Sequence, residues 1–379
     1  MKKISPMNMS QDKKHILLSG GGTGGHIFPA IAVANALKQL LPGSELLFIG
    51  ARGRMEMQKV PMAGYPIKGI WISGFQRRLS VKNLLFPFKL MVSLLMVGRI
   101  INRFKPDVVI GTGGYASGPA LKMATRKHLP TMILEQNSFP GVTNRLLAGK
   151  VDCICVAHQG MERYFPASKI IVTGNPVRQD VVRIAGKREA ALSFFGLSDQ
   201  RTTLLIIGGS QGALSINQAV ASQLSTLQGK HIQIIWQTGP HYSAQAEGLV
   251  KNGTYENTHV FPFIERMDYA YAAADVVVSR AGAIAISELC LVRKPAILVP
   301  LPSAAEDHQT KNAMALAEQQ AAIMIRDQDL GALLAETVRA LIEDKERQRH
   351  LSEQIGKMAK ADAALTIAQE AIRLMKSNK

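Results

Sequence analysis

The sequence predicts an α/β protein with two doubly wound parallel-sheet domains that face a central cleft. Short apolar runs, typical of buried parallel strands, alternate with helix-length segments. This alternation restarts about halfway along the chain, and each half opens with a strand followed by a glycine-rich turn. A chain of 379 residues also exceeds one ordinary core. We therefore expect two Rossmann-like domains, each with ligands beyond the carboxyl ends of its strands.

The first domain is placed at residues 1–175 and the second at 176–357. Strands are expected at 15–19, 46–50, 107–111, 131–135, 151–156 and 170–174, with a helix over 29–41. The second series lies at 203–209, 232–238, 259–263, 275–279, 296–300 and 321–325. The charged run from about 345 to 379 is expected to be helical and to pack on either domain.

The amino-acid composition and net charge limit the kinds of molecule that this protein is expected to bind. The formal net charge of +17 favours nucleic acid, a phosphorylated ligand or an acidic membrane surface. No zinc finger or basic-aromatic interleaving appears, which weighs against nucleic acid. The three cysteines form no disulfide framework and suggest a reducing cytosol. We expect neither a signal peptide nor a membrane-spanning segment.

The first glycine turn matches the pattern G-x-G-x-x-G through Gly20, Gly22 and Gly25. A nicotinamide dinucleotide site also needs a carboxylate after the second strand, where this chain has G-A-R. Arg52 leaves a 2′-phosphate possible, so NADP stays open. A Walker A loop is excluded because His26 stands where lysine is required.

Two glycine turns, at 19–26 and 208–213, precede predicted helices. Backbone N–H groups at such helix starts attract phosphate without a metal. Tight strand-to-helix turns are the alternative, but two copies in one chain favour ligand binding. His26 ends the first turn, where an imidazole with an unperturbed pKa of about 6.5 suits a general base. A capping or packing role for His26 is the alternative.

Other polar groups are expected at the same cleft. Glu288 follows a strand and a small-residue turn, so its carboxylate can accept two hydrogen bonds from a ribose diol; an exposed helical glutamate is the alternative. The segment 305–313 offers side chains for sugar hydroxyls, or a helix start capped by Asp307. The D-x-D of Asp327 and Asp329 favours helix capping over a metal.

The stretch 77–105 is both apolar and basic. Its longest apolar block is about nine residues, which is too short to span a membrane. It predicts either a basic amphipathic helix in an anionic membrane interface or a core helix with a solvated basic face.

Taken together, seven segments resemble the MurG family: GGTGGHIFPA, KPDVVIGTGGYASGP, EQN, GNPVR, GGSQGA, SRAGA…SE and DHQTKNA. They run in order from about residue 16 to 313. The resemblance implies a GT-B fold with a C-terminal helix, about 358–379, that crosses back onto the first domain. It implies an inverting transferase that moves N-acetylglucosamine from UDP-N-acetylglucosamine to undecaprenyl-pyrophosphoryl-N-acetylmuramoyl-pentapeptide, with no cofactor. The first 14 residues carry no family motif.

The resemblance also implies site residues. His26 would be a candidate base or acceptor orienter, with an acceptor-side loop of Gly113, Gly114 and Tyr115 and no metal. Donor contacts would be Thr23, Gly24, Gly25, Asn137, Arg178, Ser210, Ile264, Ala283, Ile284, Ala285, Ile286, Ser287, Glu288 and Gln309. It further implies a peripheral location on the cytoplasmic face of the bacterial cell membrane, with cell-wall synthesis and division proteins as partners.

Three other functions fit parts of this sequence. A UDP-sugar epimerase would need no basic apolar surface, and 77–105 argues against it. A nicotinamide oxidoreductase is disfavoured by the missing carboxylate. A noncatalytic binder of anionic membranes is disfavoured by two ligand turns facing one cleft.

Overall fold

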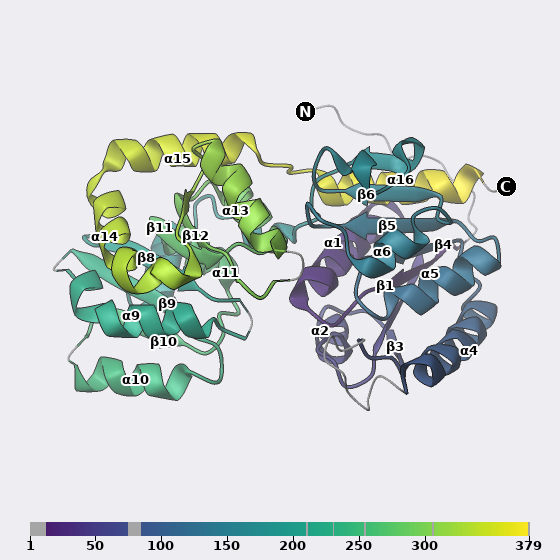
Figure 1. The fold of residues 1–379 in the computed structure, drawn as a ribbon, viewed down its shortest axis with the longest axis horizontal. Helices are drawn as coiled ribbons and strands as arrows, with labels where there is room; N and C mark the ends of the chain where they lie inside the picture. Colours follow the sequence, from purple (N-terminus) through teal and green to yellow (C-terminus); the bar gives the residue numbers. More distant parts are fainter. Residues whose placement is uncertain are drawn as a thin grey trace.

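The computed structural model describes residues 13–74, 85–209, 211–229, 231–253, 255–304 and 307–377. These residues form two α/β domains side by side (Figure 1). The strand order is β3-β2-β1-β4-β5-β6-β7 in the first sheet and β10-β9-β8-β11-β12-β13 in the second, and the paired strands run parallel. The predicted fold of two Rossmann-like domains is confirmed.

The first domain carries the elements from β1 to β7. Its strands are β1 (His15–Ser19), β2 (Glu45–Ala51), β3 (Ile67–Ile70), β4 (Val108–Gly111), β5 (Thr131–Glu135), β6 (Cys153–Val156) and β7 (Ile170–Val172). Its helices are α1 (Gly24–Leu40), α2 (Glu56–Met62), α4 (Phe86–Phe104), α5 (Ser117–Arg126) and α6 (Val142–Leu147), with 3₁₀ turns η1 (Met161–Arg163) and η2 (Ala167–Lys169).

The second domain follows from α7 onward. Its strands are β8 (Thr202–Ile207), β9 (Ile232–Gln237), β10 (Thr258–Phe261), β11 (Val276–Arg280), β12 (Ala296–Val299) and β13 (Ile323–Met324). Its helices are α7 (Gln179–Val182), α8 (Arg188–Phe195), α9 (Leu214–Leu227), α10 (Ser243–Asn252), α11 (Met267–Ala273), α12 (Ala283–Val292), α13 (His308–Glu318), α14 (Leu330–Glu343) and α15 (Lys345–Lys357), with η4 (Asp327–Asp329).

The last helix, α16 (Ala363–Ser377), leaves the second domain and packs on the first (Figure 1). Ile367, Ala368 and Ala371 are fully buried in the core that also holds the apolar face of α1. Small side chains on this face let the two helices approach closely. The chain therefore crosses between the domains twice.

The start of α1 differs from the expected helix over 29–41. The helix begins at Gly24 and contains Pro29 in its interior. Proline is common at the first helical position because it lacks the N–H that the first turn leaves unpaired, but here it lies inside the helix. Instead, His26 lies in the first helical turn, not in a loop ahead of it.

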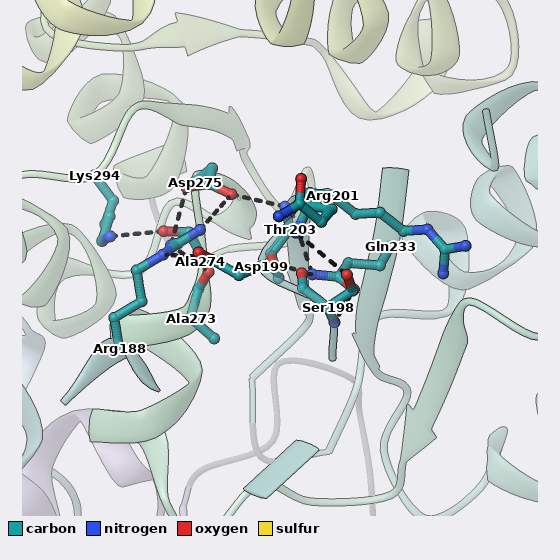
Figure 2. Close-up of polar contacts among 11 residues, drawn as sticks. Arg188, Ser198, Asp199, Arg201, Thr203, Gln233, Ala273, Ala274, Asp275 and Lys294 are labelled. Carbon is teal, nitrogen blue, oxygen red and sulfur yellow. Dashed lines mark hydrogen bonds and ion pairs between the residues drawn. The ribbon is translucent and has the colours of Figure 1, made fainter. Parts of the chain in front are cut away.

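The two ends of the second sheet have different roles. At the amino ends of its strands, the carboxylate of Asp275 accepts hydrogen bonds from the Thr203 N–H (2.8 Å) and from Arg188 (3.1 Å) (Figure 2). The Gln233 amide donates to the Thr203 hydroxyl (2.9 Å), and Lys294 donates to the Ala274 carbonyl (2.6 Å). These side chains tie the strand starts together and leave the carboxyl ends for ligands.

Candidate functional site

A cavity of about 1360 Å³ lies where the carboxyl ends of the two sheets face each other. Both glycine turns, the start of α12 and the start of α13 contribute to its lining. Most residues expected at a site lie here: Thr23, Gly24, Gly25, His26, Tyr115, Asn137, Arg178, Ile264, Ala283, Ile284, Ala285, Glu288 and Gln309. Ser210 lies outside the described residues.

His26 is fixed by its backbone and by a close glycine. Its carbonyl accepts a hydrogen bond from the Thr112 hydroxyl (2.8 Å). A Cβ on Gly113 would lie 2.6 Å from Nδ1 of His26, and Gly113 has a φ of +96°, so glycine suits this position in both respects. Gly114 packs against the carbonyl of Gly21 in the same way. Gly113 and Gly114 thus lie behind the cavity wall, and Tyr115 reaches it.

The electrostatics of His26 favour a neutral imidazole. Burial lowers the pKa of His26, and the nearby carboxylates of Glu135 and Glu56 act in the opposite direction. Its Nδ1 has no hydrogen-bond partner in the part of the chain that the structure describes. A neutral imidazole at the cavity wall can accept a proton from a substrate hydroxyl.

Asn137, which lines the same cavity as His26, is held by the buried carboxylate of Glu135. That carboxylate accepts hydrogen bonds from the N–H of Asn137 (3.1 Å), the N–H of Gly141 (3.0 Å) and the amide of Asn144 (2.9 Å). Gln136 donates to the Thr112 carbonyl (3.0 Å) and ties the strand ends of β5 and β4 together. The polar side chains after β5 are therefore in place without a ligand.

Glu288 faces the cavity from α12. Burial raises the pKa of Glu288 to about 7, although the Tyr271 hydroxyl, which donates to its carboxylate at 2.8 Å, and Arg178 both oppose the rise. Gly282 precedes α12 in an extended conformation, so the first N–H groups of the helix point to the cavity. A carboxylate between one and two turns beyond such an anion-binding start fits a nucleotide.

Two expected donor contacts lie away from the lining. Ile286 is buried in the core of the second domain because it falls on the opposite side of α12. The Ser287 hydroxyl donates to the Ala283 carbonyl (2.9 Å) and accepts from Asn175 (3.0 Å), which comes from the link between the domains. Of this run, the structure brings Ala283, Ile284, Ala285 and Glu288 to the cavity.

The second glycine turn is as tightly packed as the first. A Cβ on Gly212 would lie 1.9 Å from the Thr238 carbonyl oxygen, and the residue has a φ of +78°. The N–H of Gly208 donates to Gln237 (3.2 Å). The glycines of this turn therefore place backbone atoms without side chains at the cavity wall, at the start of α9.

Arg280 and Asp327 are cavity residues whose pairing the sequence did not reveal. Arg280 donates to the Asp327 carboxylate, to the Ser215 hydroxyl (2.7 Å) and to the Val299 carbonyl (3.3 Å). The expected capping role of the D-x-D segment is wrong, because Asp327 pairs with Arg280 and Asp329 makes no side-chain cap. A buried arginine at a strand end was the available signal, since it needs a carboxylate nearby.

The start of α13 also differs in detail from the expected cap. Asp307 occupies the cap position with a φ of +55° but makes no cap to a backbone N–H. Its carboxylate accepts from the Thr310 hydroxyl (2.6 Å). The Gln309 side chain accepts from the Leu301 N–H (3.0 Å), so it is positioned by the loop after β12.

Cations and aromatic rings face each other across the cavity. The Lys59 ammonium of the first domain lies 4.9 Å from the Phe263 ring centroid of the second. The Arg178 guanidinium lies 5.4 Å from the Phe28 ring centroid. Both distances are in the range of cation–π attraction, so these pairs help to hold the two domains together.

Comparisons with known proteins agree with this geometry. Residues 16–156 match the glycosyltransferase family 28 N-terminal domain, and residues 203–367 match the C-terminal domain of that family. A Flavobacterium psychrophilum protein named "UDP-N-acetylglucosamine--N-acetylmuramyl-(pentapeptide) pyrophosphoryl-undecaprenol N-acetylglucosamine transferase" is 49% identical over 96% of this chain and 98% of its own length. A Parabacteroides distasonis protein of the same name is 50% identical over 96% and 99%. The crystal structure of Acinetobacter baumannii MurG has a TM-score of 0.74 at 28% identity, covering 95% of this chain and 99% of that one.

Proposed function

Because this chain belongs to the MurG family of glycosyltransferases, we propose that its interdomain cavity brings a nucleotide sugar and a lipid-linked acceptor together for one displacement. The enzyme transfers N-acetylglucosamine from UDP-N-acetylglucosamine to undecaprenyl-pyrophosphoryl-N-acetylmuramoyl-pentapeptide. The observation that carries the residue assignment is that His26 of one domain and Glu288 of the other line the same cavity.

The donor is assigned to the second domain. The starts of α12 and α9, which both line the cavity, would offer backbone N–H groups to the pyrophosphate. Glu288 would accept hydrogen bonds from the ribose hydroxyls, and the backbone at Ile264 would contact the base. Gln309 and Asn137 would contact the sugar from opposite sides of the cavity.

The acceptor is assigned to the first domain. In the proposed step, the C4 hydroxyl of the muramoyl sugar attacks the anomeric carbon, and UDP leaves from the opposite face. His26 takes the hydroxyl proton, since burial keeps its imidazole neutral. The N–H groups at the helix starts stabilise the charge that develops on the leaving pyrophosphate. One such displacement converts an α-linked donor into a β-linked product.

We propose that α4 attaches this enzyme to an anionic membrane surface. Phe88, Met91 and Leu95 follow one face of α4 and are each exposed over more than half of their surface. The helix carries Lys89, Arg99 and Arg103 and no acidic residue. Among the described residues, no helix is both long and apolar enough to cross a bilayer. A cytoplasmic face and protein partners in cell-wall synthesis and division remain part of this proposal.

A transfer assay tests the proposed function. Folded protein is incubated with radiolabelled UDP-N-acetylglucosamine and a lipid I analogue, and the lipid fraction is counted. We expect labelled lipid product that disappears when the acceptor is omitted. Label that moves only into UDP-N-acetylmannosamine would favour an epimerase, and no conversion would contradict transfer.

A further inference from the structure

Glu56 is a fully buried carboxylate directly beneath the first glycine turn. It lies at the start of α2, just after the end of β2. Its two carboxylate oxygens accept hydrogen bonds from two separate segments: the N–H of Gly22 at 3.1 Å and the N–H of Ala51 at 3.0 Å. A buried carboxylate is costly, so its two backbone donors indicate a specific role.

The packing around Glu56 leaves no space for side chains on its neighbours. A Cβ on Gly21 would lie 2.1 Å from Oε1 of Glu56, and a Cβ on Gly50 would lie 2.5 Å from its Cγ. The side chain therefore fills a slot between the glycine turn and the end of β2. Because Glu56 occupies the Gly22 N–H, this group is not available to a ligand, whereas Thr23, Gly24 and Gly25 at the start of α1 line the cavity.

The charge of Glu56 also acts on His26. The charged groups that act on this imidazole are Glu135, after β5, and Glu56, from α2, and both favour its protonated form. Glu135 is already engaged in holding Asn137. Glu56 has no other assigned task, and it contacts the glycine turn that leads into α1, the helix that carries His26.

We propose that Glu56 is a positioning residue for transfer: its carboxylate clamps the glycine turn to β2 and, through its charge, stabilises the proton that His26 takes up. This inference rests on the proposed role of His26 as the base. Glu56 itself touches no substrate, so its effect is expected on kcat and on the pH profile and not on donor affinity.

The test compares Glu56→Gln with Glu56→Asp. Glutamine keeps the shape but removes the charge, and one N–H of the pair then faces an amide NH₂. Aspartate keeps the charge but is too short to reach both Gly22 and Ala51. Asp107→Asn is the matched control, because Asp107 accepts from the His15 N–H (2.8 Å) at the opposite end of the same sheet.

Two readouts separate the roles of Glu56 and His26. The first is the acid limb of the pH profile of kcat at saturating UDP-N-acetylglucosamine, where the bound donor keeps Glu288 ionised. The second is the pKa of His26 from an NMR titration assigned with His26→Gln. In Glu56→Gln we expect both to move to lower pH by about 0.5–1 unit, with a lower kcat and an unchanged Kd for UDP. In Glu56→Asp we expect a lower kcat with the acid limb near its original position. Asp107→Asn should move neither.

An unchanged His26 pKa in Glu56→Gln, or a wild-type kcat in both Glu56 variants, would overturn the inference. If the His26 pKa moves and the acid limb does not, the action of Glu56 on His26 stands and the assignment of His26 as the base fails. If Glu56→Gln does not fold, the inference is decided by Glu56→Asp, for which a wild-type kcat would refute the clamp.

Discussion

Replacing Glu288 with glutamine gives the most quantitative check of the donor site. The pKa of Glu288 is raised from an ordinary value of 4.5 to about 7, so ionising this side chain in the free protein costs about 3 kcal/mol. This figure is an upper bound, because the residue is partly open to the cavity and solvent screens its charge. Two ribose hydroxyls would donate hydrogen bonds to the ionised carboxylate, and these bonds would offset the free energy of ionisation. Binding of the nucleotide should therefore expel the proton that Glu288 carries below pH 7.

The expected affinity follows from the ionised fraction. With a pKa of about 7, that fraction rises about tenfold between pH 6 and pH 8, so UDP should bind about tenfold more tightly at pH 8. Glu288→Gln should lose this dependence and bind about 30-fold more weakly at pH 8, which corresponds to about 2 kcal/mol. Isothermal titration calorimetry in two buffers of different ionisation enthalpy measures both the affinity and the proton release.

The pH dependence of the free energy of unfolding of the ligand-free protein provides an independent test. Between pH 4.5 and 7 the unfolded chain ionises Glu288 while the folded chain keeps it protonated, so the free energy of unfolding falls as pH rises through this window. Glu288→Gln should lack that fall and should be the more stable form at pH 8. A UDP affinity equal in both proteins, with the same pH dependence, would refute the assignment.

Three further changes probe the base, the buried ion pair and the membrane face. His26→Ala is expected to lower kcat by about 10²–10⁴-fold with an unchanged Kd for UDP, and near-normal turnover would remove His26 as the base. Asp327→Asn leaves Arg280 without its counter-charge, so urea titration should show a loss of about 3–5 kcal/mol, whereas a loss below about 1 kcal/mol would contradict a buried pair. Met91→Glu with Leu95→Glu should weaken co-sedimentation with phosphatidylglycerol vesicles while donor affinity is unchanged; undiminished co-sedimentation would contradict the role of α4.

Much of the fold follows from the sequence because strands buried on both faces of a parallel sheet read as continuous apolar runs. Twelve such runs correspond to strands. The strand β3 was missed because its four residues, IKGI, include a lysine and a glycine and are only partly buried. It sits at the edge of the sheet, where the apolar signal is weakest.

Site residues could be predicted where they directly follow a strand in the sequence. They could not be predicted where their role depends on a partner that is distant in the sequence. The glycine turns and His26 could be placed because each follows a strand directly. Arg280 and Asp327 lie 47 residues apart, so no spacing rule joins them. Glu56 was missed for the same reason: its contacts with Gly22 form only after β2 has paired beside β1.

The central claim is that one displacement in the interdomain cavity joins the two substrates. The most direct measurement is the anomeric configuration of the product made from UDP-[1-¹³C]N-acetylglucosamine and a lipid I analogue, read by NMR from the one-bond carbon–hydrogen coupling at the labelled carbon. We expect a β-linked N-acetylglucosamine on the C4 oxygen of the muramoyl sugar. An α-linked product, or label found only in free sugar or in an epimerised nucleotide sugar, would contradict the mechanism.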